Sequence, residues 1–216
     1  MVLLLAAIIL SYLVGSIPAG YIVGKLFKGV DIRNYGSGNI GFTNALRVLG
    51  VVPGIIVLLA DVGKGATAVL AISRLGGLQP NALTPYLPAL CGAFAIAGHI
   101  WTVFLKFRGG KGVATSLGIF ISISPLAGLI SLGVWIIVVA ITRYVSLGSI
   151  LLCISFCVVV SVTNGQYIWG IRILALAVTA IVIYRHKGNI QRLIRGEERK
   201  FGHREQPSEG QIIERG

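Results

Sequence analysis

Two glycine-rich segments contain the residue types that bind phosphate groups. The first, "GSGNIGFTNALR" at residues 36–47, combines three glycines with a serine, two asparagines and an arginine. Glycine lets the backbone approach a ligand closely, and successive amides can form an anion-binding nest. If residues 42–49 form a helix, its N-terminus adds free amides, and Arg47 can grip a phosphate through two parallel hydrogen bonds. We therefore predict a phosphate site from Gly36, Ser37, Gly38, Asn39, Gly41, Asn44 and Arg47. The alternative is an ordinary glycine-rich connector, which would need neither the asparagines nor the arginine.

A second segment, "KFRGGKGVATS" at residues 106–116, repeats this chemistry around a lysine. Flexible backbone around a point charge, just before an expected helix at Val113, is typical of a phosphate site. It is not a Walker A loop, because a glycine follows the lysine and the first glycine of that pattern is missing. The alternative interpretation is a basic flank of a membrane segment. The predicted ligands are Gly109, Gly110, Lys111 and Gly112.

A third polar segment is "TRYVSLGS" at residues 142–149. Ser146 and Ser149 can either cap a helix or bind a ligand, because a hydroxyl serves both purposes. Both interpretations stay open for these serines.

A fourth polar segment, "IYRHKGNIQRL" at residues 183–193, follows the last apolar stretch. His186 and Asn189 are three residues apart, so they share a face on a continuous helix. Arg185 and Lys187 lie beside them and are expected to anchor the helix end among lipid headgroups. We predict His186 and Asn189 as site residues.

Ionisable residues also occur inside apolar stretches, where they are costly unless paired or functional. Asp61 and Lys64 are three apart, and we expect a structural ion pair that faces the interior of the bundle. We expect His99 to be a hydrogen-bonded interior histidine. The sequence contains no cluster with metal-ligand spacing, so we expect neither a metal nor a cofactor.

The composition predicts an all-α integral membrane protein that must position these segments. Of its 216 residues 55% are hydrophobic and only 12% are charged, and the mean hydropathy is +0.87. A membrane crossing needs roughly 17 to 25 helical residues. The apolar stretch at 113–141 contains Pro125, which cannot continue a helix, so we predict two helices there and a seven-helix bundle in all. A six-helix bundle with one tilted helix at 113–141 is the alternative. The remaining crossings are expected near residues 2–25, 51–73, 86–104, 146–163 and 168–185.

The net charge of +12 follows from topology rather than from binding to nucleic acid. Basic residues gather in alternate loops, while the intervening loops carry only Arg74 and Arg172, which predicts an external N-terminus and a cytoplasmic C-terminus. The first segment lacks a basic start and a cleavage site, so we expect no cleaved signal peptide. We expect residues 1–201 to form a single transmembrane domain and residues 202–216 a disordered cytoplasmic tail.

The order of the polar motifs resembles the bacterial acyl-phosphate:glycerol-3-phosphate acyltransferase family (PlsY). The motifs are "GSGNIGFTNALR", "FRGGKGVATS", "RYVSLGSI" and "YRHKGNIQRL", and the similarity also includes "GSIPAGY" at residues 15–21 and "DVGKG" at residues 61–65. The resemblance covers about residues 10–200. Phe42 stands where the family usually has a small residue, Thr102 where it often has proline, and Gly188 where a longer polar residue is common. None of these departures removes a phosphate-binding group, but Phe42 is expected to narrow the pocket.

The resemblance implies a seven-helix enzyme of the bacterial inner membrane with a cytoplasmic active site. It implies transfer of a fatty acyl chain from acyl phosphate to the 1-hydroxyl of sn-glycerol 3-phosphate, which yields lysophosphatidic acid and inorganic phosphate and starts phospholipid synthesis. It also implies transient contact with the soluble enzyme that makes acyl phosphate. By this resemblance Ser37, Arg47 and Lys111 bind phosphate groups, and Ser149, His186 and Asn189 complete the pocket.

The chemistry of an acyl phosphate fits this set of residues. A mixed anhydride carries a good leaving group, so no covalent acyl-enzyme is required, and the sequence has neither a G-x-S-x-G elbow nor an H-x-x-x-x-D motif. The proton of the attacking hydroxyl can go to the phosphate of the acyl phosphate, which we favour, or to His186. The alternatives from other classes are a membrane transporter of small organophosphate anions and, more remotely, a structural lipid-binding protein.

Overall fold

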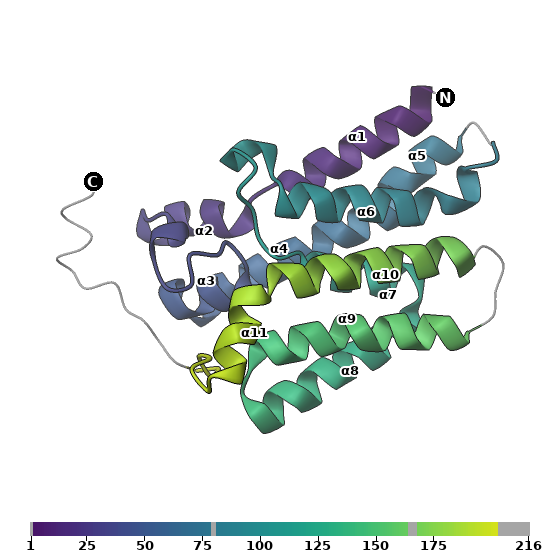
Figure 1. The fold of residues 1–216 in the computed structure, drawn as a ribbon. Coiled ribbons are helices and arrows are strands. Elements are labelled where there is room, and N and C mark those ends of the chain that lie inside the picture. Colours follow the sequence, from purple (N-terminus) through teal and green to yellow (C-terminus); the bar gives the residue numbers. More distant parts are fainter. Residues whose placement is uncertain (1, 79–80, 164–167, 203–216) are drawn as a thin grey trace.

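The computed structural model describes residues 2–78, 81–163 and 168–202, and this part of the chain contains helices and no strand (Figure 1). The predicted all-α fold is therefore confirmed. A π-helix, η2 (Ala68–Ile72), joins α4 to α5. The α-helices are α1 (Val2–Ser16), α2 (Ala19–Lys28), α3 (Phe42–Leu49), α4 (Val51–Thr67), α5 (Ser73–Gly77), α6 (Leu87–Ile100), α7 (Val113–Ile123), α8 (Pro125–Thr142), α9 (Val145–Val162), α10 (Ile168–Arg185) and α11 (Lys187–Ile194).

The long apolar helices identify a multi-pass membrane protein. Among the described residues, five segments are long and apolar enough to cross a membrane, and the pair α10–α11, which bends by 60°, is a sixth candidate. The predicted break at Pro125 is confirmed, because α7 ends at Ile123 and α8 begins at the proline. With 11 residues, α7 is only about 16 Å long, shorter than the bilayer core. A total of seven crossings stays a prediction.

Two apolar cores hold the helices together. The larger joins α1, α6, α7, α9 and α10, and it contains the rings of Phe120 and Phe156, stacked with centroids 3.7 Å apart. The smaller lies beneath α2 and α3, where Ile32, Ile40 and Val48 are buried. Because this second core underlies residues 36–41, it supports the first glycine-rich segment.

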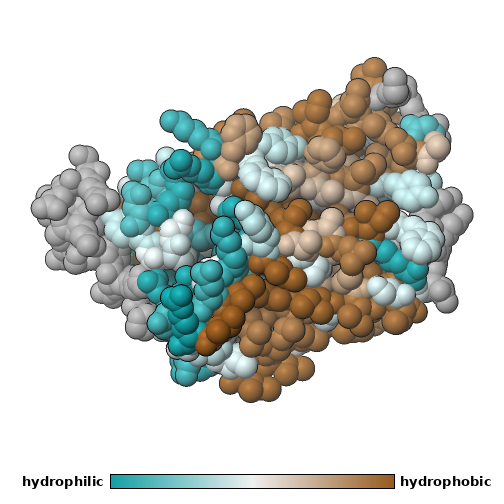
Figure 2. Space-filling view, in the orientation of Figure 1, coloured by the Kyte–Doolittle hydropathy of each residue, from teal (hydrophilic) through white to brown (hydrophobic). Residues whose placement is uncertain are grey.

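Hydrophilic side chains gather at the end of the bundle that carries α2, α3 and α11, whereas hydrophobic side chains cover most of the long helices (Figures 1 and 2). The expected buried ion pair lies inside the bundle, with Lys64 Nζ 2.8 Å from Asp61 Oδ1. His99 is buried in the interior as expected, but its Nδ1, 3.5 Å from the same carboxylate oxygen, does not make the expected hydrogen bond. Apart from Gly202, the expected disordered tail lies outside the described residues.

Candidate active site

A cavity of about 580 Å³ opens at the polar end of the bundle. Four helices, α3, α7, α9 and α11, begin at its wall, and their first residues Phe42, Val113, Val145 and Lys187 line it. The first amides of a helix have no partner within the helix, and the helix dipole places partial positive charge there. The arrangement favours an anionic ligand. The sequence predicted three of these helix starts, those of α3 and α7 and, to within one residue, that of α9.

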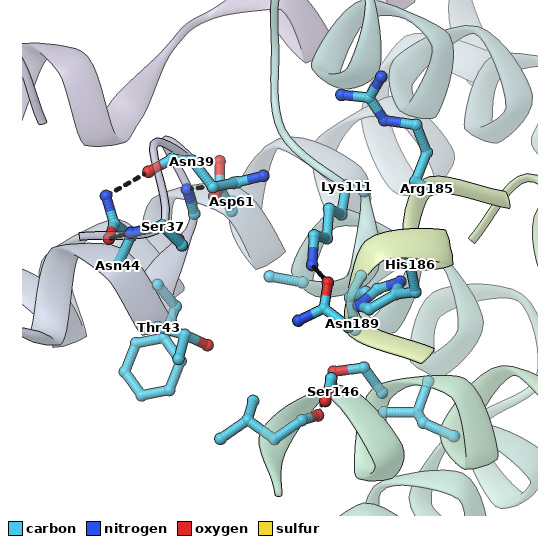
Figure 3. A pocket seen from close by; sticks show the side chains of 18 of the residues that line it. Ser37, Asn39, Thr43, Asn44, Asp61, Lys111, Ser146, Arg185, His186 and Asn189 are labelled. Carbon is cyan, nitrogen blue, oxygen red and sulfur yellow. Dashed lines mark hydrogen bonds between the residues drawn. The ribbon is translucent and has the colours of Figure 1, made fainter. Parts of the chain in front are cut away.

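Figure 3 shows how the predicted site residues face one another across the cavity. Ser37, Asn39 and Asn44 lie on one side, and Lys111, His186 and Asn189 lie on the other. Gly38, Gly109 and Gly110 are the predicted site residues that do not line the cavity. Those that do are Gly36, Ser37, Asn39, Gly41, Asn44, Arg47, Lys111, Gly112, Ser149, His186 and Asn189.

Asn44 organises the first glycine-rich loop from within. The two N–H groups of its Nδ2 are shared among three carbonyl oxygens, those of Ile32 at 2.9 Å, Tyr35 at 3.2 Å and Asn39 at 2.8 Å. Its Oδ1 accepts the backbone N–H of Ser37 at 2.8 Å. Asn44 is almost fully buried, so its amide holds the loop together rather than reaching far into the cavity.

The amides of the first loop differ from the expected anion nest. Gly38 N–H donates to the carbonyl of Tyr35, and Gly41 N–H donates to Oδ1 of Asn39. These donors are already used inside the loop. The polar groups at the cavity wall are instead the Ser37 side chain and the first turn of α3, followed along the same helix by Arg47.

The second glycine-rich loop is held by distant elements. Gly109 N–H donates to the carbonyl of Ile100, and Gly110 N–H donates to that of His99, both at 3.0 Å. Arg185, expected to anchor lipid headgroups, instead donates from Nη2 to the carbonyl oxygens of Gly110 at 3.1 Å and Gly109 at 3.4 Å. The amides of these two glycines are therefore turned into the protein and not toward a ligand.

Lys111 reaches the cavity and donates to Oδ1 of Asn189. Burial lowers the pKa of its ammonium to about 8, although the nearby Glu198 carboxylate opposes this shift. The lysine is therefore mostly charged at neutral pH. It is a point charge in a partly dry site, where an electrostatic interaction with phosphate is stronger than in water.

His186 lies at the bend between α10 and α11, so the continuous helix expected over His186 and Asn189 is interrupted. Both residues nevertheless line the cavity. His186 Nδ1 lies 2.8 Å from the carbonyl oxygen of Val182. Because a carbonyl only accepts, Nδ1 carries the proton and Nε2 has a free lone pair. Burial and the charge of Lys111 lower the pKa of His186 to about 4, so the ring is neutral.

Sequence reasoning missed Glu198, which lies after α11 in a segment that folds back to the cavity. Its carboxylate accepts from Asn189 at 2.6 Å, from Ser146 at 2.8 Å and from Arg192 at 2.8 Å. Burial would raise the pKa of Glu198, but these hydrogen bonds outweigh it and lower the pKa. No local motif indicated this role, because Glu198 belongs to a charged stretch beyond the last apolar segment.

Ser149 and a group of apolar side chains complete the wall. Ser149 donates to the carbonyl of Val145 at 2.8 Å, so its oxygen keeps lone pairs for another donor. The apolar part of the cavity wall suits a hydrocarbon chain. It is formed by Leu58, Leu117, Leu132, Trp135 and Leu152.

Comparisons with known proteins agree with this geometry. A family model described as glycerol-3-phosphate acyltransferase matches residues 5–196. The chain belongs to this family. A member of the family from Synechococcus elongatus is 45% identical over 202 residues, which cover 92% of this chain and 95% of that protein. Another, from Desulforudis audaxviator, is 44% identical over 195 residues, which cover 90% and 94%.

Solved structures of this acyltransferase family have the same fold. A crystal structure of PlsY, an integral membrane glycerol 3-phosphate acyltransferase in its glycerol 3-phosphate form, matches with a TM-score of 0.83. It is 39% identical in sequence and covers 92% of this chain and 96% of its own. The lysophosphatidic acid form matches with a TM-score of 0.81 at 38% identity, covering 93% and 96%. The family resemblance inferred from the motifs is confirmed.

Proposed function

We propose that this chain transfers a fatty acyl group from an acyl phosphate to the 1-hydroxyl of sn-glycerol 3-phosphate, producing lysophosphatidic acid and inorganic phosphate. The observation that carries the proposal is one cavity with two kinds of lining residue: helix N-termini with Lys111 and Arg47, and apolar side chains. Anionic phosphate groups fit the first kind and an acyl chain fits the second. Family membership supports the same reaction. An organophosphate transporter finds no support, because the polar groups lie at one end of the bundle and not at its middle.

In this proposal Lys111, Arg47 and Ser37 bind phosphate oxygens, and Gly36, Asn39 and Asn44 shape the loop that carries the serine. Ser149, His186 and Asn189 complete the pocket on the opposite wall. The first amides of α3 and α7, which follow Gly41 and Gly112, point partial positive charge at the same space. Binding both phosphates beside each other brings the hydroxyl close to the acyl carbonyl, and this proximity supplies much of the rate.

The reaction needs only one bond exchange at the acyl carbon. The substrate hydroxyl oxygen attacks the carbonyl carbon, the carbonyl oxygen becomes an oxyanion, and the C–O bond to phosphate then breaks. The hydroxyl proton leaves with the departing inorganic phosphate when that phosphate acts as the base. His186 Nε2 is the alternative acceptor, but a pKa of about 4 makes it a weak base at neutral pH. We therefore favour the substrate phosphate.

We further propose that residues 1–201 act as one domain in the bacterial inner membrane, with the N-terminus outside and the cavity on the cytoplasmic side. Basic residues at the cavity, such as Arg47 and Lys111, support this orientation. A water-soluble enzyme that makes acyl phosphate would then meet the site from the cytoplasm by transient contact.

The proposal is tested by acyl transfer with detergent-purified protein and labelled glycerol 3-phosphate. Palmitoyl phosphate, palmitoyl-CoA and palmitoyl-carrier protein are offered in parallel, with Lys111→Ala as the control. Lysophosphatidate formed only from the acyl phosphate, and lost in the variant, supports reaction and donor. Product from the thioesters alone overturns the donor, and no product from any donor overturns the proposal.

A further inference from the structure

The Gly109–Gly110 pair lies outside the cavity wall, yet it carries the lysine that reaches into it. We infer that Arg185 and His99 are positioning residues that fix this pair and thereby set the position of the Lys111 ammonium. The inference rests on the proposed function of Lys111 as a phosphate ligand. Both residues also line the cavity, and the inference concerns their contacts with the glycine pair.

A glycine pair cannot fix the lysine by itself. Glycine has the widest choice of backbone conformations, so two in succession leave the next residue free to swing unless other groups hold them. The backbone bonds from these amides to α6 fix one edge of the pair. The carbonyl oxygens of Gly109 and Gly110 are left for a separate donor.

Arg185 supplies that donor from the end of α10, 75 residues away along the chain. One nitrogen, Nη2, lies 3.1 Å from the carbonyl of Gly110 and 3.4 Å from that of Gly109. A guanidinium holds its donors in a rigid plane, whereas a lysine ammonium is a flexible point charge. Arginine therefore fixes both peptide planes in a way that lysine reproduces only in part.

His99 holds the same pair through its ring. A Cβ atom on Gly110 would lie 2.1 Å from His99 Nε2, so the imidazole occupies the space of a missing side chain. The ring is itself fixed, because it is buried and its Nδ1 faces the Asp61 carboxylate, which pairs with Lys64. Lys64 in turn donates to the carbonyl of Ile17 at 3.1 Å. The buried ion pair thus supports the loop through His99.

The consequence for the reaction follows from distance. If a residue that binds phosphate moves by about 1 Å, the reaction rate can fall on the order of 100-fold, even when the mutation lies away from the reacting atoms. Removing the contact of either Arg185 or His99 with the glycine pair should displace Lys111 while leaving the bundle folded. Such variants should have a lower kcat/KM for glycerol 3-phosphate but a melting temperature close to that of the wild type.

The first experiment compares Arg185→Gln and Arg185→Lys with wild-type protein in the acyl phosphate assay, together with melting temperature in detergent. Arg172→Gln is the matched control, because Arg172 lies on the same helix and donates to the carbonyls of Val160, Ser161 and Thr163 at the far end of the bundle. We expect kcat/KM to fall about 100-fold in Arg185→Gln and about 10-fold in Arg185→Lys. We expect Arg172→Gln to keep wild-type kcat/KM. Equal kcat/KM for Arg185→Gln and wild type overturns the role of Arg185.

The second experiment is a double-mutant cycle with Gly110→Ala, His99→Ala and the combined variant. Gly110→Ala should lower kcat/KM on the order of 100-fold, because its methyl group meets the imidazole. The combined variant should recover at least part of that loss, since removing the ring makes room for the methyl group. Strictly additive losses, or a double variant worse than Gly110→Ala, overturn the role of His99. If wild-type protein itself fails in the assay, the proposed function is wrong; if wild type is active and these variants match it, only the positioning inference fails.

Discussion

The two glycine-rich loops face the same cavity but are held in opposite ways. The loop at residues 36–41 is tied by Asn44, a side chain from the helix that follows it directly. The loop at residues 106–112 is tied by α6 and by Arg185, which lies 75 residues later than Gly110. The first loop is therefore held by nearby residues, whereas the second depends in addition on a contact with the distant end of α10.

The difference extends to what each loop gives the cavity. The first presents a serine, the start of α3 and, one turn farther along, Arg47. The second presents one ammonium, that of Lys111, at the start of α7. Because this ammonium is the charge that the second loop contributes, we expect its removal to be the most damaging change to the site.

Lys111→Ala removes that charge and should have the largest effect. We expect kcat to fall by about 10³-fold or more, because the variant loses the ammonium that reaches the cavity beside Asn189, and a cation aimed at phosphate in a partly buried site contributes strongly. The protein should stay folded, since the side chain points into the cavity. Arg108→Ala removes a charge from an exposed position of the same loop and should keep wild-type kcat. Turnover of Lys111→Ala near the wild-type level would contradict the assignment.

Asn44→Ala tests the local hub of the first loop. It leaves three carbonyl oxygens without their donor and the Ser37 amide without its acceptor, so we expect the free energy of unfolding to fall by about 2 to 4 kcal/mol. Activity should fall about 100-fold, because Ser37 and the start of α3 lose their support.

Asn44→Asp sharpens this test, because the carboxylate still accepts from the Ser37 amide but cannot donate to the carbonyls. A loss comparable with that of Asn44→Ala would show that the donated bonds hold the loop. If both variants had the melting temperature and activity of the wild type, Asn44 would not be the residue that holds the first loop together. Unlike Lys111→Ala, these variants should lose stability and activity together.

The sequence predicted most of the helices and many residues of the polar end, because both follow from patterns among residues that are close together in the chain. Apolar runs predicted the spans, and Pro125 predicted the break between α7 and α8. The motif residues were predicted to lie together, and the structure gathers most of them around one cavity. Long-range contacts were not predictable. Neither the bond from Arg185 to the second loop nor the one from Glu198 to Asn189 has a local signal.

The pH dependence should separate the two loops, because only the second carries a group that titrates near neutrality. Burial lowers the pKa of Lys111 to about 8, so its ammonium is present below that pH and is lost above it. We expect kcat/KM for glycerol 3-phosphate to fall roughly tenfold per unit above pH 8. A bound phosphate stabilises the ammonium, so the change should appear mainly in KM. Steady-state kinetics from pH 6 to about 10 measure this, and a flat profile to pH 10 would contradict it.

His186 belongs to neither loop, and its replacement should have the smallest effect. With a pKa of about 4 the ring is neutral at pH 7 and has an accepting Nε2, but it is a weak base. We expect His186→Gln to lower kcat only about 10-fold, because glutamine keeps a polar contact and the substrate phosphate still accepts the proton. Activity falls at low pH when the base becomes protonated, so a phosphate base leaves that limb of the profile in place in the variant. A low-pH limb that disappears together with His186 would assign the base to histidine, and the two loops would then position the substrates around a protein base rather than complete the site by themselves.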